Sequence, residues 1–510
     1  FFFHPQPGKR DCLLSRGLGD VYKRQFLLRW IIKDKTLKRE FSLLKIFLYS
    51  LLLFLLLVSL FALLNLYKPI QKLKVNKSLV GEVNLIKSDS HTFRDLNKNN
   101  LLDVYEDHRL PSKIRANDLL DRMTIEEKVG QMFHPPFTLS PDLLMLVYEI
   151  AIRGNKLTEA KIVLDNITHF NLYGNPSPTE LAKRINYFQK IASKTRLGVP
   201  VTISSDPIHE VPKGGGVASF SVDGYSKWPS QLGFAATNDP SIIQNFAEIA
   251  REEYLATGIR TALHPMSDLA TEPRWARNFG TFGSNAELSS KMTLAYMEGF
   301  QGKNISEKSV HTMVKHFPGG GPQENGLDPH LFSGRNQNYP GNNFNYHLLP
   351  FKDAIKNNLK VIMPYYGIPV GITDEDVAMG YNEYILSDLL RNELGFDGVV
   401  CSDWGIISGR HWGVDNLSIK ERYKKSLIAG IDQYGGEDDP EHIIRLINDG
   451  EISIERINNS DIDELVVTNS IPLNKEAQKC SKIRVISISN IIAECITRLS
   501  NEESLSEMFL

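Results

Sequence analysis

The sequence predicts an α/β fold, a (β/α)8 barrel of the TIM type, over residues 114–459. Three observations favour it: eight short apolar runs, amphipathic helical patterns between most of them, and polar residues directly after several runs. The expected strands are Gln131–Phe133, Thr168–Tyr173, Pro200–Ser205, Thr261–Pro265, His311–His316, Lys360–Pro364, Gly398–Ser402 and Gly430–Gln433. The expected helices include Thr179–Ser193, Ile242–Ala256, Leu288–Phe300 and Asn382–Glu393. A doubly wound open sheet is the alternative architecture.

Three segments are expected at the N-terminal end. Residues 1–25 contain DCLLSRGLGDVYKRQ, which resembles translated linker sequence, so we leave them out of the fold prediction. Residues 26–45 form a basic segment that we expect in the cytoplasm. The uncharged run Ile46–Tyr67 would span roughly 33 Å as a helix and predicts a transmembrane signal anchor rather than a cleaved signal peptide. More Lys and Arg precede this run than follow it, which predicts a single-pass protein of the cell membrane with a periplasmic or extracellular barrel.

Residues 68–113 are expected to be a linker that contains a calcium-binding loop. Residues 95–106, DLNKNNLLDVYE, carry oxygen-bearing side chains at the ligand positions of a twelve-residue EF-hand loop. The expected ligands are Asp95, Asn97, Asn99, Asp103 and Glu106. A polar linker with chance spacing is the alternative. We therefore predict a structural Ca²⁺, and no cofactor that catalysis requires.

Composition excludes some classes of partner. Lys and Arg total 58 and Asp and Glu total 60, with no basic stripe, so we expect no nucleic-acid partner. The four cysteines have neither metal-ligand spacing nor a disulfide framework. The sequence does not determine an oligomeric state.

Polar side chains follow the expected strands at the end where barrel enzymes place their active sites. They include Asp206, Lys315, His316, Tyr365 and Asp403. The run before Asp403 is apolar, and burying an unpaired carboxylate is costly, so we expect Asp403 to face a shared cleft. A long loop, 318–346, begins with Gly319–Gly321, which we expect to let the backbone approach a ligand closely.

Five motifs occur in the order seen in one enzyme family. They are LLDRMTIEEKVGQM, SSDPIHE, EPRWARNFGTFG, VKHFPGGGPQENGLDPH and GFDGVVCSDWG. Together they resemble glycoside hydrolase family 3, the β-glucosidase-like enzymes, over about Phe93–Asn459. The resemblance implies a retaining hydrolase of β-linked gluco-oligosaccharides or aryl β-glucosides, with a carbohydrate as its partner.

The resemblance also implies roles for single residues. Asp403 in the S-D-W motif matches the nucleophile that forms a covalent glycosyl-enzyme. Residues matching the sugar-binding positions are Asp206, Arg277, Lys315 and His316. Independently of the family, Arg277 and Lys315 would favour the ionised form of Asp403, and Trp404 offers an apolar face to the ring. We add Tyr365, which directly follows the sixth expected strand, to the substrate-binding residues.

The general acid/base is not identified by these motifs. In two-domain members of the family a glutamate from a second α/β sandwich domain completes the site, and residues 460–510 are too few for such a domain. We interpret them as a divergent tail that a frameshift would explain. One alternative is a β-N-acetylhexosaminidase that uses Asp328 and His330 as the acid/base pair. Others are a non-catalytic sugar-binding remnant and a Schiff-base lyase that uses Lys315.

Overall fold

A computed structural model describes residues 70–139, 157–210 and 222–453, a few residues before 70, and two short strands near the C-terminal end. The chain divides into two units, Phe1–Lys74 and Val75–Leu510. The first unit lies largely outside the described residues, as do the predicted segments 1–25 and 26–45. The predicted tail, 460–510, is described only at β14 (Leu465–Thr468) and β15 (Ile483–Ile486), which pair in parallel.

The prediction of a transmembrane helix is corrected. In the part of the chain that the structure describes, we find no helix with the length and apolar character needed to cross a membrane. Of the run Ile46–Tyr67 the structure describes only residues 48–52, and the remainder lies outside the described residues. The prediction depended on hydropathy alone, which the described helices do not support, so the membrane localisation and the membrane partner are withdrawn with it.

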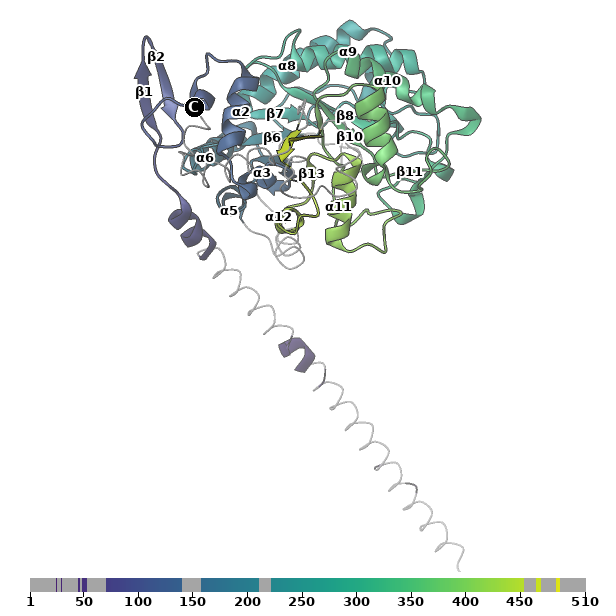
Figure 1. The fold of residues 1–510 in the computed structure, drawn as a ribbon. Helices are drawn as coiled ribbons and strands as arrows, with labels where there is room; N and C mark the ends of the chain where they lie inside the picture. Colours follow the sequence, from purple (N-terminus) through teal and green to yellow (C-terminus); the bar gives the residue numbers. More distant parts are fainter. Residues whose placement is uncertain are drawn as a thin grey trace, which may run out of the picture. The chain divides into compact units, whose positions relative to one another are not determined.

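A mostly parallel sheet forms the centre of the second unit. In the described residues its strands are ordered β12-β10-β8-β7-β6-β5-β4, and each neighbouring pair is parallel. Their bounds are β4 Pro136–Thr138, β5 His169–Tyr173, β6 Thr202–Ser205, β7 Ile259–Ala262, β8 His311–Phe317, β10 Val361–Pro364 and β12 Val399–Val400. Figure 1 shows strands of this sheet at the centre of the unit with helices around them.

Two further short strands connect the ends of the sheet. β13 (Tyr434–Gly435) pairs in parallel with β3 (Phe133–His134), which is separated from β4 by Pro135 alone. On the other side, Gln433 forms a parallel bridge with Cys401, just after β12. The strand order therefore closes on itself, and the carboxyl ends of the strands meet at one face.

The observed strands differ from the expected regular set at two positions. The first strand, expected at Gln131–Phe133, lies later in the chain and consists of two pieces, β3 and β4, because Pro135 between them lacks the N–H that a continuous ladder needs. The last lies at Tyr434–Gly435 rather than Gly430–Gln433. Gly430 has a φ of 128° and ends a helix, so the chain becomes extended only after it.

Helices with clear start signals separate the strands. Their bounds are α3 Ile125–Gly130, α5 Thr158–Leu164, α6 Pro178–Ala192, α7 Gln231–Ala235, α8 Pro240–Thr257, α9 Ala286–Gln301, α10 Phe344–Lys356, α11 Ile419–Ala429 and α12 Glu441–Asn448. A further helix of π type covers Tyr384–Glu393. α6 begins at Ser177, whose hydroxyl accepts from the N–H of Glu180 in a capping box. Apolar faces of these helices pack on the sheet, as in the buried Phe188 of α6 and Tyr254 of α8.

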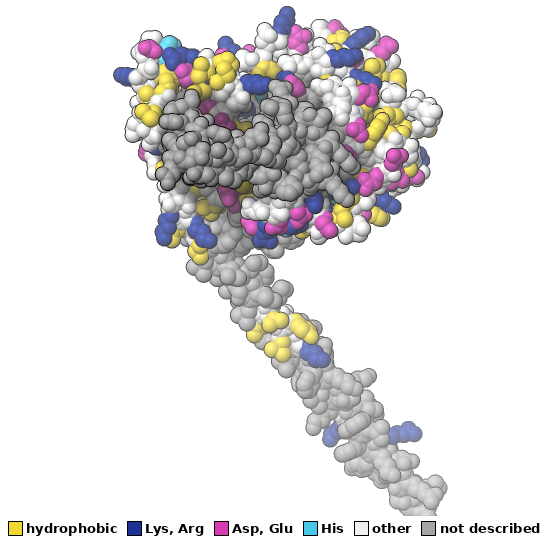
Figure 2. Space-filling view, viewed as in Figure 1, with side chains coloured by type: hydrophobic (Ala, Val, Ile, Leu, Met, Phe, Trp, Pro, Cys, Tyr) yellow, Lys and Arg dark blue, Asp and Glu magenta, His cyan; other side chains and the backbone are white. Residues whose placement is uncertain are grey.

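Smaller elements lie outside this framework. They are the hairpin β1 (Asn84–Ser88) and β2 (His91–Asp95), the turn η1 (Val104–Glu106), the helix α2 (Ser112–Arg122), and the parallel pair β9 (Asn336–Gln337) and β11 (Ile368–Pro369). Figure 2 shows acidic and basic side chains interspersed over the described part of one face.

A small second core lies between the strand ends. Leu263, Met313, Met363 and Cys401 form an apolar cluster separate from the main core, and Trp404 packs against it. These residues belong to or directly follow β7, β8, β10 and β12. The polar residues that follow the strands are thus supported from below by packed side chains.

Candidate active site

A cavity of about 80 Å³ opens where the carboxyl ends of the strands meet. Its lining residues are Tyr173, Asp206, Leu263, Arg277, Lys315, His316, His330, Met363, Tyr366, Asp403, Trp404 and Arg410. Seven of the predicted site residues are in this list. Tyr365 and Asp328 are not, and they instead contact residues of the cavity wall.

Asp403 stands directly after β12 with one carboxylate oxygen uncommitted. Oδ1 accepts a hydrogen bond from the backbone N–H of Trp404 at 2.8 Å. Oδ2 is buried and has no hydrogen-bond partner among the described residues, and Nε2 of His316 lies 3.7 Å from it. An unsatisfied buried acceptor costs free energy, so this oxygen is placed for a group that enters the cavity.

Asp206 and Lys315 form a buried ion pair on the cavity wall. Nζ of Lys315 donates to Oδ1 of Asp206 at 2.8 Å, and the two side chains are 6% and 12% exposed. Glu210, which the sequence analysis did not single out, belongs to this charge network. Burial raises the pKa of Glu210 to about 7, against the effect of Lys315 and with that of Asp206.

His316 is oriented by Asp268, a fully buried carboxylate. Oδ2 of Asp268 lies 2.6 Å from Nδ1 of His316, and Oδ1 accepts from the backbone N–H groups of His316 and Gly320. Burial would raise the pKa of Asp268, but His316, Gly320 and Arg277 together hold it below its ordinary value. The ring nitrogen Nε2 is thereby directed towards Asp403.

The pKa of His316 is lowered, and burial is the main cause. Asp268 and Asp403 oppose this shift, whereas the charge of Arg277 contributes to it. His316 is therefore a neutral ring in the site at neutral pH.

Arg277 connects His316 of β8 with Tyr365, the residue after β10. Its Nη1 donates to Oη of Tyr365 at 3.0 Å and lies 3.5 Å from Nε2 of His316. Burial would lower the pKa of Arg277, but Tyr365 and the neighbouring carboxylates raise it overall. Tyr365 thus acts through Arg277, while the next residue, Tyr366, lines the cavity.

Asp328 and His330 form a close pair in the long loop. Nδ1 of His330 lies 2.5 Å from Oδ1 of Asp328, which also accepts from the backbone N–H of His330. Oδ2 accepts from Nε1 of Trp275 at 2.9 Å. Burial would raise the pKa of Asp328, but hydrogen bonding and charge from His330 hold it well below its usual range. With Nδ1 engaged, Nε2 is the nitrogen of His330 left for the cavity.

Trp404 is placed by the backbone of the last strand. A Cβ at Gly435 would lie 2.7 Å from Cε3 of the indole, and one at Gly436 would lie 2.9 Å from Cδ1. Real side chains do not tolerate such contacts, so these two positions require glycine for the ring to stand here. The same segment is held by the hydroxyl of Ser402, which accepts from the N–H of Gly435.

Comparison with known proteins identifies the family. The model of the glycosyl hydrolase family 3 N-terminal domain matches residues 124–463. The chain belongs to glycosyl hydrolase family 3. It is 47% identical over 375 residues to beta-glucosidase C of Emericella nidulans, which covers 71% of this chain and 59% of that protein. It is 38% identical over 403 residues to a periplasmic beta-glucosidase/beta-xylosidase of Dickeya chrysanthemi, covering 74% and 61%.

The structural comparison agrees with this family. The crystal structure of a beta-glucosidase from Listeria innocua in complex with glucose superposes with a TM-score of 0.55 at 25% identity, covering 68% of this chain and 45% of that one. The match to this chain covers about three fifths of the length of the two curated relatives. A second model, a phosphoribosyl synthetase-associated domain, matches residues 442–510 and gives the tail a resemblance that the sequence analysis did not find.

The predicted calcium loop of this family 3 chain brings its five residues together, and their side chains bond to groups of the loop and of α2. Glu106 accepts from the backbone N–H groups of Leu96 and Asn97, and Asp103 forms an ion pair with Arg122 at 2.8 Å. Among the described residues, no group of three or more His, Cys, Asp or Glu side chains is arranged to hold a metal. This arrangement does not fit Ca²⁺ without rearrangement, and calcium stays a prediction.

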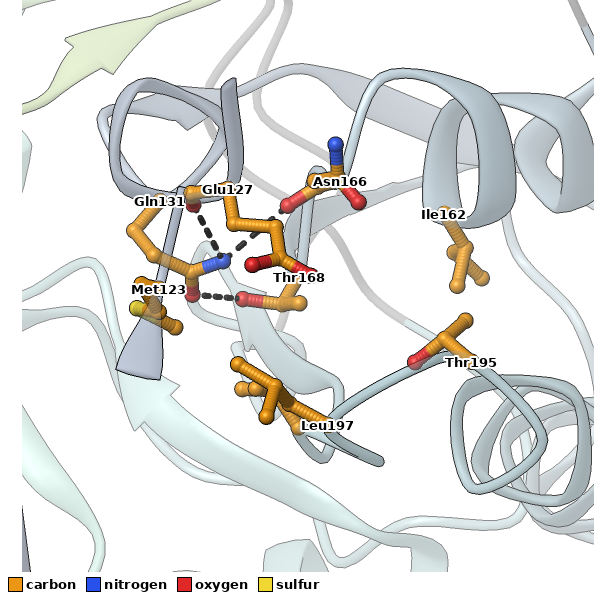
Figure 3. A pocket seen from close by; sticks show the side chains of 9 residues that line it. Met123, Glu127, Gln131, Ile162, Asn166, Thr168, Thr195 and Leu197 are labelled. Atoms are coloured by element: carbon orange, nitrogen blue, oxygen red, sulfur yellow. Dashed lines mark hydrogen bonds between the residues drawn. The ribbon is translucent and has the colours of Figure 1, made fainter. Parts of the chain in front are cut away.

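A smaller pocket, of about 20 Å³, lies between α3 and the start of β5 (Figure 3). Nε2 of Gln131 donates to the carbonyls of Glu127 and Asn166, and Oε1 accepts from the hydroxyl of Thr168. These polar groups hydrogen-bond to one another. We therefore interpret the pocket as a packing gap between helix and sheet and not as a second binding site.

Proposed function

We propose that the chain is the barrel part of a retaining β-glucosidase, acting on β-linked gluco-oligosaccharides or aryl β-glucosides. One observation carries the proposal: Oδ2 of Asp403 is a buried acceptor without a partner in a cavity whose walls bear hydrogen-bonding groups for a sugar. The beta-glucosidase names of the relatives at 46–47% identity support this substrate class over the β-N-acetylhexosaminidase alternative.

The geometry supports a two-step displacement. Asp403 attacks the anomeric carbon through Oδ2 and forms a glycosyl-enzyme, which water then cleaves. The N–H of Trp404 holds Oδ1, so the carboxylate cannot rotate away from the reacting carbon. Asp206 and Lys315 would bind sugar hydroxyls by exchanging part of their ion pair for hydrogen bonds to the substrate.

The proton for the leaving group has one candidate donor in the cavity wall. His330 lines the cavity, and its Nδ1 is engaged by Asp328. We propose that His330, protonated on both ring nitrogens, gives the Nε2 proton to the glycosidic oxygen when the leaving group is poor, and regains a proton at Nε2 from the water that cleaves the glycosyl-enzyme. Leaving groups that depart without acid help need only Asp403, so aryl glucosides suit this chain best.

A slow substrate tests the nucleophile. A 2-deoxy-2-fluoro β-glucoside with a good leaving group should add one fluoroglucosyl unit to the chain in intact-mass spectra. Peptide mapping should place it on Asp403, and Asp403→Asn should abolish it. The matched control is Asp397→Asn, an exposed carboxylate six residues earlier, which should label like the wild type. A label on another carboxylate would refute the assignment, and sugar binding without any label would favour the non-catalytic alternative.

A further inference from the structure

Arg410 lines the cavity, and neither the motifs nor the mechanism above uses it. It lies seven residues after Asp403, in a tight loop closed by hydrogen bonds from the N–H groups of Gly409 and Arg410 to the carbonyl of Gly405. Its Nη1 donates to the carbonyl of Trp404 at 2.8 Å. The guanidinium is therefore fixed in place rather than free to move in solvent.

The charge of Arg410 is not neutralised within the part of the chain that the structure describes. No ion pair joins it to a described carboxylate, and its Nε is buried without a hydrogen-bond partner. The other two cations of the cavity differ, because Lys315 pairs with Asp206 and Arg277 is surrounded by acidic groups. A planar guanidinium that has no carboxylate partner among the described residues suits a carboxylate ligand, which it can bind through charge-assisted hydrogen bonds.

The neighbours of Arg410 indicate which part of a substrate meets it. Its guanidinium lies 5.0 Å from the ring centre of Tyr366, and the ring of His330 lies 4.8 Å from the same tyrosine ring. His330 and Trp404 are partly exposed, whereas Asp206, Lys315 and His316 are buried. A sugar bound at the buried end would leave its leaving group beside the partly exposed Trp404 and Arg410.

We infer that Arg410 is a specificity-determining residue that selects aryl β-glucosides whose aromatic leaving group carries a carboxylate. The partly exposed Trp404 offers an apolar face to the aryl ring, and Arg410, which lies over the buried ring of Tyr366, pairs with the acidic group at its edge. The inference rests on the proposed function, because it places the glucose at the buried end beside Asp403.

Two matched ligands test the inference, 4-carboxyphenyl and 4-carbamoylphenyl β-glucoside, which differ in charge but hardly in shape. The wild type should prefer the carboxylate about tenfold in kcat/KM, the size of one charge-assisted hydrogen bond. Arg410→Gln should remove this preference, and Arg410→Lys should retain part of it. A purely structural role would lower both values together and leave their ratio unchanged. The control is Arg335→Gln, since Arg335 stacks on Phe332 outside the cavity.

The same pair as 1-thio-β-glucosides separates this inference from the proposed function, because the sulfur analogues bind without turnover. Calorimetry should give the wild type an about tenfold lower Kd for the carboxylate, lost in Arg410→Gln, even if fluoroglucoside labelling fails. Equal Kd values for the two thioglucosides would overturn the inference while leaving the labelling result intact. Formation of glucose 1-phosphate in phosphate buffer, dependent on Arg410 and without any preference between the pair, would also overturn it by assigning the anion to the attacking group.

Discussion

Replacing Lys315 alone should destabilise the fold more than replacing both members of its ion pair. Two unit charges 2.8 Å apart attract by roughly 6 kcal/mol at an effective dielectric constant of about 20. Most of this is offset by the loss of hydration of two side chains that are 6% and 12% exposed. Lys315→Met leaves Asp206 as an uncompensated buried carboxylate, which we expect to lower the free energy of unfolding by about 3 kcal/mol.

The double variant Lys315→Met/Asp206→Leu removes both charges and should recover most of that loss, ending within about 1 kcal/mol of the wild type. Urea unfolding followed by tryptophan fluorescence measures both values, and the double-mutant cycle gives the coupling. Turnover should stay low in both variants, because neither presents the polar pair to the sugar. Equal stability of the single variant and the wild type, or no recovery in the double variant, would refute the reasoning.

Three further predictions concern the support of the site, acid stability and calcium. Asp268→Asn should lower kcat/KM about tenfold or more and change its pH profile, because His316 loses the carboxylate that orients its ring; an unchanged profile would mean that Asp268 is only structural. Burial lowers the pKa of His134 to about 3 and of His169 to about 4, so only the unfolded chain takes up these protons between pH 7 and 5. The free energy of unfolding should therefore decrease by roughly 2 kcal/mol for each histidine as the pH is lowered from 7 to 5. Urea unfolding at the two pH values measures this, and an unchanged unfolding midpoint would contradict it. Millimolar Ca²⁺ should raise the Tm through the 95–106 loop and should not do so in Asp95→Ala; equal shifts in both would remove the loop as the site.

Much of the fold could be predicted from periodicity. The bounds of α6, expected at Thr179–Ser193 and found at Pro178–Ala192, show how far an amphipathic pattern with a capping residue determines a helix. The short strands were harder, because β12 and β13 hold only two residues each and their pairing depends on partners far along the chain. The membrane prediction was wrong because it depended on hydropathy, whereas no helix among the described residues is long and apolar enough to span a membrane.

The site was predictable where polar residues lie at or near the carboxyl ends of strands, as with Lys315 within β8 and Asp403 after β12. It was not predictable where a side chain acts through another, as with Asp268, whose contact with His316 spans 48 positions. Gly320 also differs from the expectation. A Cβ there would lie 2.7 Å from Tyr365 and 2.9 Å from Asp268, so the glycine admits close packing of site residues rather than of a ligand.

The closing strand has a consequence for the order in which activity can appear. Trp404 is supported by Gly435 and Gly436, and these hydrogen-bond to the chain at Ser402 and His134. Asp403 and Trp404 are therefore synthesised some thirty residues before the segment that fixes the indole beside Asp403. During synthesis the site stays incomplete until that segment has left the ribosome and joined the first strand, so the emergence of catalysis would report the joining of the two distant ends of the barrel.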